Sequence, residues 1–179
     1  GNVGIGTTSP GRPLTINSDT SHRAIRILEN DSANESWDIG VDVDGDLNFF
    51  NSANSDPTVV FSDAGNVGIG TDSPSAKLHV KSNNAGSFTY DTTADDFIVE
   101  SNANGGMTIA TAAANTGRII FASPDDPTGA EISFSQGSNL MKVGPTNGSV
   151  DLVLQAASGT EFMRLDASSS NVGIGTTSP

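Results

Sequence analysis

The string GNVGIGTTSP at Gly1–Pro10 returns as GNVGIGTDSP at Gly65–Pro74 and as NVGIGTTSP at Asn171–Pro179. A string this long does not recur twice by chance in a chain of 179 residues, so its copies mark an internal repeat. Self-similarity of this kind is the signature of proteins built from stacked units. We therefore expect the chain to form an array of repeated modules.

The repeated unit is larger than the glycine motif, because the first two copies stay in register beyond it at a constant offset of 64 residues. We expect a first module over residues 1–64 and a longer second module over 65–170, with a β-sandwich-like insertion over 96–166. Residues 171–179 begin a third module. A module of about 64 residues with few large side chains buries too little surface to be stable alone. Neighbouring modules or neighbouring chains must therefore complete its core.

Apolar residues within the modules recur with a period of two, as in WDIGVDVD at Trp37–Asp44. This alternation predicts a strand with an apolar, buried face and a polar face toward solvent. A loop of three residues, Asp44–Asp46, would place Val43 opposite Leu47 on the returning strand. Phe50 points away from the predicted buried face, which suggests a second apolar contact with another chain.

The second module repeats the pattern, with turn signals between its segments and no convincing amphipathic helix. Strands are expected at Lys77–Ser82, Asp96–Glu100, Met107–Thr111, Arg118–Ala122, Glu131–Ser135, Asp151–Gln155 and Glu161–Asp166. The predicted fold class is therefore all-β, a modular repeat array of short antiparallel strands in β-prism or β-sandwich-like modules.

Composition excludes several partners. The chain has 8 Lys and Arg against 21 Asp and Glu, a formal net charge of −13, and its few cations are scattered singly. Phosphate backbones and anionic membrane surfaces require clustered cations, so we expect no nucleic acid partner. No run approaches the roughly 18 apolar residues of a membrane span, and we expect no membrane insertion.

The glycine motif contains Gly68-Ile69-Gly70, which opens like a dinucleotide-binding fingerprint. That fingerprint needs a third glycine and a helix N-terminus, and neither follows here, so we expect no cofactor. A structural role fits better, because glycines that alternate with Val67 and Ile69 leave a bare face for the close approach of another backbone. Around a three-fold axis, that backbone would belong to an identical chain. The residues assigned to this structural motif are Gly4, Gly6, Val67, Gly68, Ile69, Gly70, Gly173 and Gly175.

Acidic residues offer the main alternatives for a site. Asp42, Asp44 and Asp46 are calcium candidates, but the glycine precedes the third Asp and no bidentate Glu closes the loop. Solvent-facing Asp beside a tight turn is the simpler interpretation. The pairs Asp95-Asp96 and Asp125-Asp126 are interpreted as turn caps rather than as the facing carboxylates of a glycosidase.

His22 and His79 are the only histidines, and the alternation places His79 on the solvent face of its strand. We expect both to be exposed or at an interface. Asn30, Asn34 and Asn147 match the N-glycosylation pattern, which a chain rich in Asn and Ser also produces by accident. No residue can be assigned to receptor binding.

A resemblance adds to this interpretation. The motif followed by Lys77-Leu78-His79-Val80, and preceded by the MRLDA strand at Met163–Ala167, resembles the shaft repeats of trimeric tail fibres and tail spikes of tailed bacteriophages and related virus-like or surface fibres. The segment RIIFASPDDPTGAEISF, which ends at Phe134, is similar to a module of the same shafts. Such repeats commonly lie upstream of an endosialidase-type intramolecular chaperone, which is not part of this sequence, so autoproteolysis cannot be assigned to it.

The resemblance implies an intertwined homotrimeric β-fibre, extracellular or on a virion, in which each chain has two identical chains as partners. Its expected role is structural and non-enzymatic, with attachment to a host-surface glycan or protein receptor. Two alternatives stay open. One is a polysaccharide-degrading glycosidase of the tailspike type, and the other is a monomeric β-solenoid adhesin.

Overall fold

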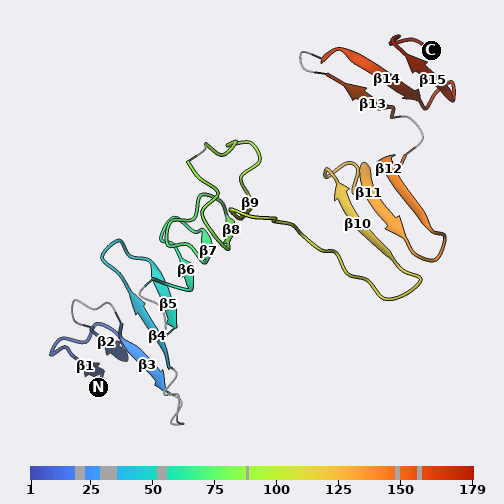
Figure 1. The fold of residues 1–179 in the computed structure, drawn as a ribbon. Coiled ribbons are helices and arrows are strands. Elements are labelled where there is room, and N and C mark those ends of the chain that lie inside the picture. Colours follow the sequence, from blue (N-terminus) through green and yellow to red (C-terminus); the bar gives the residue numbers. More distant parts are fainter. Residues whose placement is uncertain (19–22, 29–35, 52–55, 88, 148–149, 157–158) are drawn as a thin grey trace. The chain divides into compact units, whose positions relative to one another are not determined.

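The computed structural model describes residues 1–18, 23–28, 36–51, 56–87, 89–147, 150–156 and 159–179 (Figure 1). All the regular elements among the described residues are β-strands, which confirms the all-β class. The chain forms two compact units, Gly1–Gly106 and Met107–Pro179. None of the described residues forms a helix long and apolar enough to cross a membrane.

The first unit contains a two-stranded sheet, β1-β2, and a seven-stranded sheet in which β3 to β9 follow one another in chain order (Figure 1). Its strands are β1 Val3–Ile5, β2 Leu14–Ile16, β3 Ile25–Leu28, β4 Ser36–Val41, β5 Leu47–Asn51, β6 Val59–Phe61, β7 Val67–Ile69, β8 Leu78–Lys81 and β9 Phe97–Glu100. The sheet continues from β6 into β7, so it crosses the boundary between residues 64 and 65 that the sequence repeat suggests.

Strand direction differs from expectation in this unit. The pairs from β3 to β7 are antiparallel, but β1-β2, β7-β8 and β8-β9 are parallel. The prediction of antiparallel strands throughout is therefore wrong at these three pairs. At β1-β2 and β7-β8 the cause is the glycine motif, whose turn and following loop carry the chain back to start the next strand in the same direction. The β8-β9 pair lies beyond the motif, and residues 82–96 make its connection.

The first two copies of the motif have the same pairing. Val3 pairs with Leu14 in β1-β2, and Val67 pairs with Leu78 in β7-β8. The repeat found in the sequence is therefore also a repeat of strand register. In the third copy, the motif strand β15 pairs with the antiparallel strand that precedes it, as β7 pairs with β6.

The hairpin between β4 and β5 has a different register from the predicted one. Val41, rather than Val43, lies opposite Leu47, and the loop comprises residues 42–46. The carboxylate of Asp42 accepts hydrogen bonds from the backbone N–H groups of Asp44 and Asp46, each at 3.0 Å. These bonds close a five-residue loop, and they explain why the three-residue loop does not form.

The second unit contains two three-stranded antiparallel sheets, β10-β11-β12 and β13-β14-β15. Their strands are β10 Thr116–Phe121, β11 Ala130–Ser135, β12 Leu140–Pro145, β13 Leu152–Gln155, β14 Glu161–Asp166 and β15 Asn171–Ile174. The predicted strands around β10, β11, β13 and β14 are confirmed. β12 was not predicted, and the strand predicted at Met107–Thr111 is absent from the single chain.

Candidate functional site

The candidate functional site is one face of the seven-stranded sheet. Residues that pair across neighbouring strands share a face, so the registers of β3 to β9 define its composition. Apart from Asn51, every position on this face is apolar. We call it the apolar face; it consists of Ile25, Ile27, Trp37, Ile39, Val41, Leu47, Phe49, Val59, Phe61, Val67, Ile69, Leu78, Val80, Phe97 and Val99, with Asn51.

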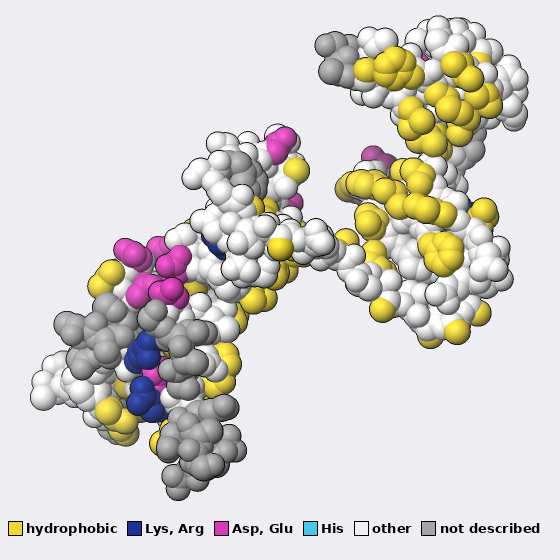
Figure 2. Space-filling view, viewed as in Figure 1, with side chains coloured by type: hydrophobic (Ala, Val, Ile, Leu, Met, Phe, Trp, Pro, Cys, Tyr) yellow, Lys and Arg dark blue, Asp and Glu magenta, His cyan; other side chains and the backbone are white. Residues whose placement is uncertain are grey.

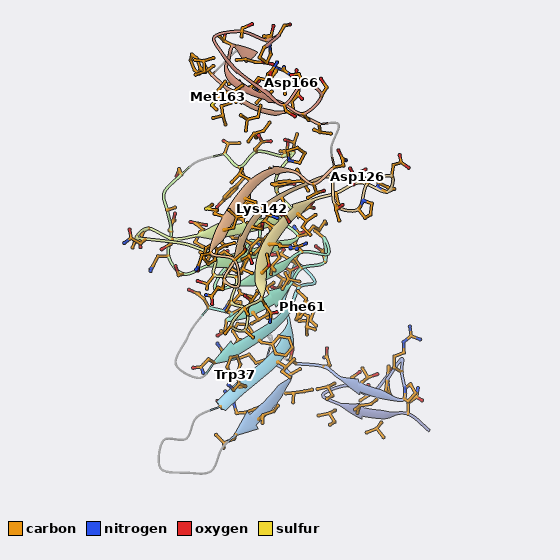
Figure 3. All side chains as sticks on the ribbon, turned by 90° about the vertical axis from the view of Figure 1, so that its right-hand side faces the viewer. Trp37, Phe61, Asp126, Lys142, Met163 and Asp166 are labelled. Carbon is orange, nitrogen blue, oxygen red and sulfur yellow. The ribbon has the colours of Figure 1, made fainter. Side chains whose placement is uncertain are left out.

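This face is open to solvent in the single chain, and the opposite face is covered. Trp37 is 42% exposed and Phe61 46%, whereas Asp38, which follows Trp37, is 2% exposed. Figure 3 shows Trp37 and Phe61 along the sheet. The prediction that the apolar face of β4 is buried and its polar face solvated is therefore wrong for the single chain. The chain's own loops cover the polar side, and nothing among the described residues covers the apolar side.

The accessible surface of the whole chain gives a scale for this exposure. The chain exposes 12452 Å². Two compact units of these sizes would together expose about 9,800 Å², so the excess is roughly 2,700 Å². The exposed side chains of the apolar face contribute to this excess.

The second unit repeats this arrangement on a smaller scale. In the β10-β11-β12 sheet, Ile119, Ile132 and Val143 lie side by side and are exposed, whereas Glu131 and Ser133 on the other face are buried. Leu165 and Val172 pair on the exposed face of β13-β14-β15. Figure 2 shows hydrophobic side chains gathered over both sheets.

The polar face of the seven-stranded sheet is held by an ion-pair cluster at one end. The guanidinium of Arg26 donates to both carboxylate oxygens of Asp38, at 2.7 and 2.8 Å, and Arg23 adds a third bond at 3.2 Å. The hydrogen bonds from Arg26, against the opposing effect of burial, hold the pKa of Asp38 below its usual value. Arg23 also lies 4.4 Å from the ring centre of Phe50. Phe50 is therefore covered by its own chain, and the suggestion that it contacts another chain is wrong.

A second buried cluster lies on β8 and β9. His79 is 2% exposed, so the prediction that it faces solvent is wrong. Its Nδ1 accepts a hydrogen bond from the backbone N–H of Ser75 at 3.3 Å, which places the ring proton on Nε2, 3.1 Å from a carboxylate oxygen of Glu100. Both ring nitrogens are thus occupied by structural partners, and neither is available for catalysis or metal binding.

Glu100 is the centre of this second cluster. Its carboxylate also accepts hydrogen bonds from the backbone N–H of Ala85 at 2.8 Å and from the Tyr90 hydroxyl at 2.9 Å, and Lys81 lies 3.5 Å away. The bond from Ala85, opposed by burial and assisted by Tyr90, lowers the pKa of Glu100. Burial and the bond to Glu100 raise the pKa of Tyr90. The cluster neutralises a buried carboxylate and fixes the loop between β8 and β9.

The glycine motif has the same geometry in its three copies. A Cβ on Gly68 would lie 2.4 Å from the carbonyl oxygen of Thr71, and the equivalent distances are 2.5 Å in the first copy and 2.8 Å in the third. The glycine two residues later has φ of 73° in the first two copies and 71° in the third. Asn66 donates from its side chain to the carbonyl of Pro74, and the other two copies have the same bond.

The close approach of another backbone to these glycines is therefore confirmed, but its source differs from the prediction. The approaching carbonyl belongs to the turn that follows in the same chain, not to a second chain. Gly70 is different, because its Cβ would lie 2.2 Å from the carbonyl oxygen of Lys81 on the parallel strand β8, outside the motif. The turn around Gly68 and its equivalents is thus self-contained.

The calcium candidates do not form a cation site. Asp42 uses one carboxylate oxygen for the loop amides and the other for the side-chain amide of Asn48 at 2.7 Å. Burial raises the pKa of Asp42, but these hydrogen bonds outweigh that effect and hold the pKa below its usual value. Asp46 accepts a bond from the backbone N–H of Asp63 at 2.8 Å. In the part of the chain that the structure describes, no three His, Cys, Asp or Glu side chains converge as metal ligands.

The remaining predicted positions have structural partners or lie outside the described residues. Asp126 accepts from the backbone N–H of Thr128 and from the side chain of Asn147, as expected of a turn cap. His22, Asn30 and Asn34 lie outside the described residues. Whether Asn147 carries a glycan stays a prediction.

Sequence reasoning missed the buried polar residues because it took the alternating Asp, Asn and His side chains as solvent-facing. The sequence does contain one signal that Asp38 is buried. Arg23 and Arg26 precede its strand by a short stretch of sequence, and a buried carboxylate requires cationic partners. No protein-family model matches the sequence, and no curated protein matches it.

Proposed function

We propose that this chain is a structural segment of a homotrimeric fibre, extracellular or on a virion, whose core is formed between identical chains. The apolar face carries the proposal, because a sheet that covers its polar side and leaves nine large apolar side chains of its other side exposed is incomplete as a single chain. Exposed patches of this size mark interaction surfaces. The number of three chains comes from the resemblance of the glycine motif to trimeric shaft repeats.

Closure of the fibre would also protect the edges of the sheets. An exposed strand edge next to apolar side chains is prone to unwanted pairing, and a closed homo-oligomer removes both hazards together. The charge of −13 per chain opposes association, so the assembly should be more stable at higher ionic strength. Acidic surfaces in turn keep neighbouring fibres apart.

The mass of the native particle tests the proposal. Sedimentation equilibrium is expected to give three times the chain mass of 18.2 kDa, about 55 kDa, with a β-sheet circular dichroism spectrum. A folded particle of one chain would refute the proposal and favour the monomeric solenoid. A dimer or tetramer would refute the three-fold arrangement.

Attachment to a host-surface glycan or protein is the second part of the proposal, and it rests on the resemblance. A trimer displays each loop three times, so weak contacts gain avidity. Binding to immobilised host-surface glycans, compared between the trimer and a dissociated variant, tests this part. Release of soluble sugar from the same glycans would instead favour the glycosidase alternative.

A further inference from the structure

Residues Met107–Thr111 have the pattern of a strand but no partner in the single chain. Met107, Ile109 and Thr111 alternate with Thr108 and Ala110, and Met107 and Ile109 are exposed. Among the hydrogen bonds of the described residues, none involves this segment. All five residues are exposed in the single chain, so their backbone groups are left to water and are free to pair with another strand.

The adjacent sheet has an edge that matches this segment. β10 is the outer strand of the β10-β11-β12 sheet, and it pairs only with β11 among the described residues. Its six residues, Thr116–Phe121, are long enough to pair with all five residues of the segment. An unpaired edge beside apolar side chains is a template for another strand.

The segment does not pair with β10 of its own chain. Its Ile109 side chain lies over the sheet face, with Cγ2 3.4 Å from the point where a Cβ on Gly117 would be. The turn that follows holds the segment over the sheet. Ala114 in this turn has φ of 67°, and its carbonyl lies against Gly137. The backbone N–H of Gln136 donates to the carbonyl of Asn115 at 3.3 Å.

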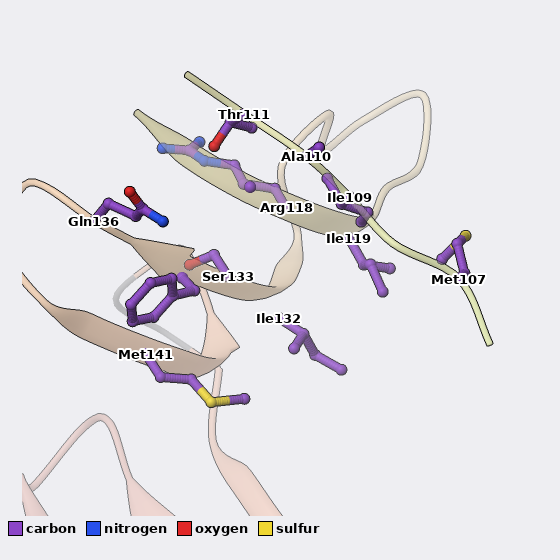
Figure 4. Close-up of a pocket in the computed structure, with 12 residues that line it drawn as sticks. Met107, Ile109, Ala110, Thr111, Arg118, Ile119, Ile132, Ser133, Gln136 and Met141 are labelled. Atoms are coloured by element: carbon purple, nitrogen blue, oxygen red, sulfur yellow. The ribbon is translucent and has the colours of Figure 1, made fainter. Parts of the chain in front are cut away.

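A cavity of about 480 Å³ remains between the segment and the sheet. It is lined mainly by apolar side chains, including Met107, Ile119, Ile132 and Met141, with Arg118 at its margin (Figure 4). Figure 4 shows the segment running past β10 on its way to the turn. The cavity is open to solvent, so much of its apolar lining is exposed in the single chain.

We propose that residues Met107–Thr111 of one chain pair with β10 of a second copy of this chain. This inference rests on the proposed homotrimer. In a ring of identical chains, the segment of each chain pairs with β10 of the next chain, and its own β10 pairs with the segment of the preceding chain. Every segment and every β10 edge therefore has a partner. The segment lies directly after Gly105 and Gly106, at the boundary between the two units, and in its place over its own sheet its backbone groups stay free for the β10 edge of a neighbour.

Hydrogen exchange of the native particle tests whether the segment is paired. The backbone amides of residues 107–111 are expected to exchange at least about 100-fold more slowly than in a free peptide. Residues 104–106 are the matched control, because they belong to the same connection and carry the turn sequence Asn-Gly-Gly. Free exchange of the segment in a particle that sediments as a trimer overturns the inference and leaves the proposed function standing.

Photo-crosslinking identifies the partner. The variant Ile109→p-benzoylphenylalanine, and a second one with the same probe at Met107 in case the first misfolds, are irradiated as native particles and separated under denaturing conditions. The expected product is a covalent dimer or trimer whose linked peptide contains Thr116–Phe121. Linkage within one chain, or to another part of the neighbour, overturns the inference. A particle of one chain refutes the homotrimer and the exchange together.

Discussion

Removal of one aromatic ring from the apolar face should strongly lower the association constant of the assembly. Phe61 is 46% exposed, and its ring packs edge-on against Phe49 at 5.9 Å. A Phe side chain presents about 200 Å², so assembly would cover roughly 90 Å² more. At about 25 cal/mol per Å², Phe61→Ala costs about 2 kcal/mol per chain and about 7 kcal/mol per trimer.

This cost corresponds to a decrease of about 10⁵-fold in the association constant of three chains. Because the midpoint concentration of a trimer varies as the inverse square root of this constant, the midpoint of dissociation should rise by roughly 300-fold. Sedimentation equilibrium over a dilution series measures the midpoint directly. The spectrum of the diluted variant shows whether the released chains stay folded.

Val43→Ala is the matched control. Val43 is 81% exposed at the tip of the β4-β5 loop and lies off the apolar face, so its truncation should leave the midpoint unchanged. Equal midpoints for Phe61→Ala and the unmodified chain would show that Phe61 stays exposed in the particle. In that case the apolar face is not the interface.

Three further predictions concern the fold itself. The pKa of Asp38 is lowered in the folded chain, so the stabilisation that its carboxylate provides is present above the unfolded pKa of about 3.9 and is lost as the pH falls through the folded pKa. Urea midpoints measured from pH 7 to pH 3 should therefore decrease on acidification. The decrease should be smaller in Asp38→Asn. Ser170 has φ of 58°, so Ser170→Gly should raise the free energy of unfolding by about 0.5–1 kcal/mol, and an unchanged urea midpoint would contradict this. A Cβ on Gly68 meets the carbonyl of Thr71, so Gly68→Ala should lower that free energy by about 1–3 kcal/mol, whereas Gly106→Ala, with open space around it, should leave the melting temperature unchanged.

The period of two in the sequence predicts most strands of the second module, although it misses β12 and places one at Met107–Thr111, and the constant offset of the repeat corresponds to equal registers in β1-β2 and β7-β8. The alternation of apolar and polar residues does not predict which side of the sheet is covered. Alternation separates two sets of side chains, but burial depends on where the loops fold. Here the loops cover the side that carries Asp38 and His79, because the carboxylates of Asp38 and Glu100 find cations and amides there.

The register error at the β4-β5 hairpin has a similar origin. The apolar pattern favours Val43 as a strand residue and therefore predicts a loop of three residues. The side chain of Asp42 bonds to two loop amides and to Asn48, and this local network sets the loop length instead. Such side-chain-to-backbone bonds compete with strand pairing, and the apolar pattern does not contain them.

The self-contained turn of the glycine motif has a consequence for how such chains change over generations. Each copy closes on itself through its own Asn side chain, its own carbonyl and its own glycines. A genetic crossover between two copies would therefore join an upstream segment to a new downstream segment without breaking any of these contacts. Chain length could then grow or shrink by whole units, with each junction already stable.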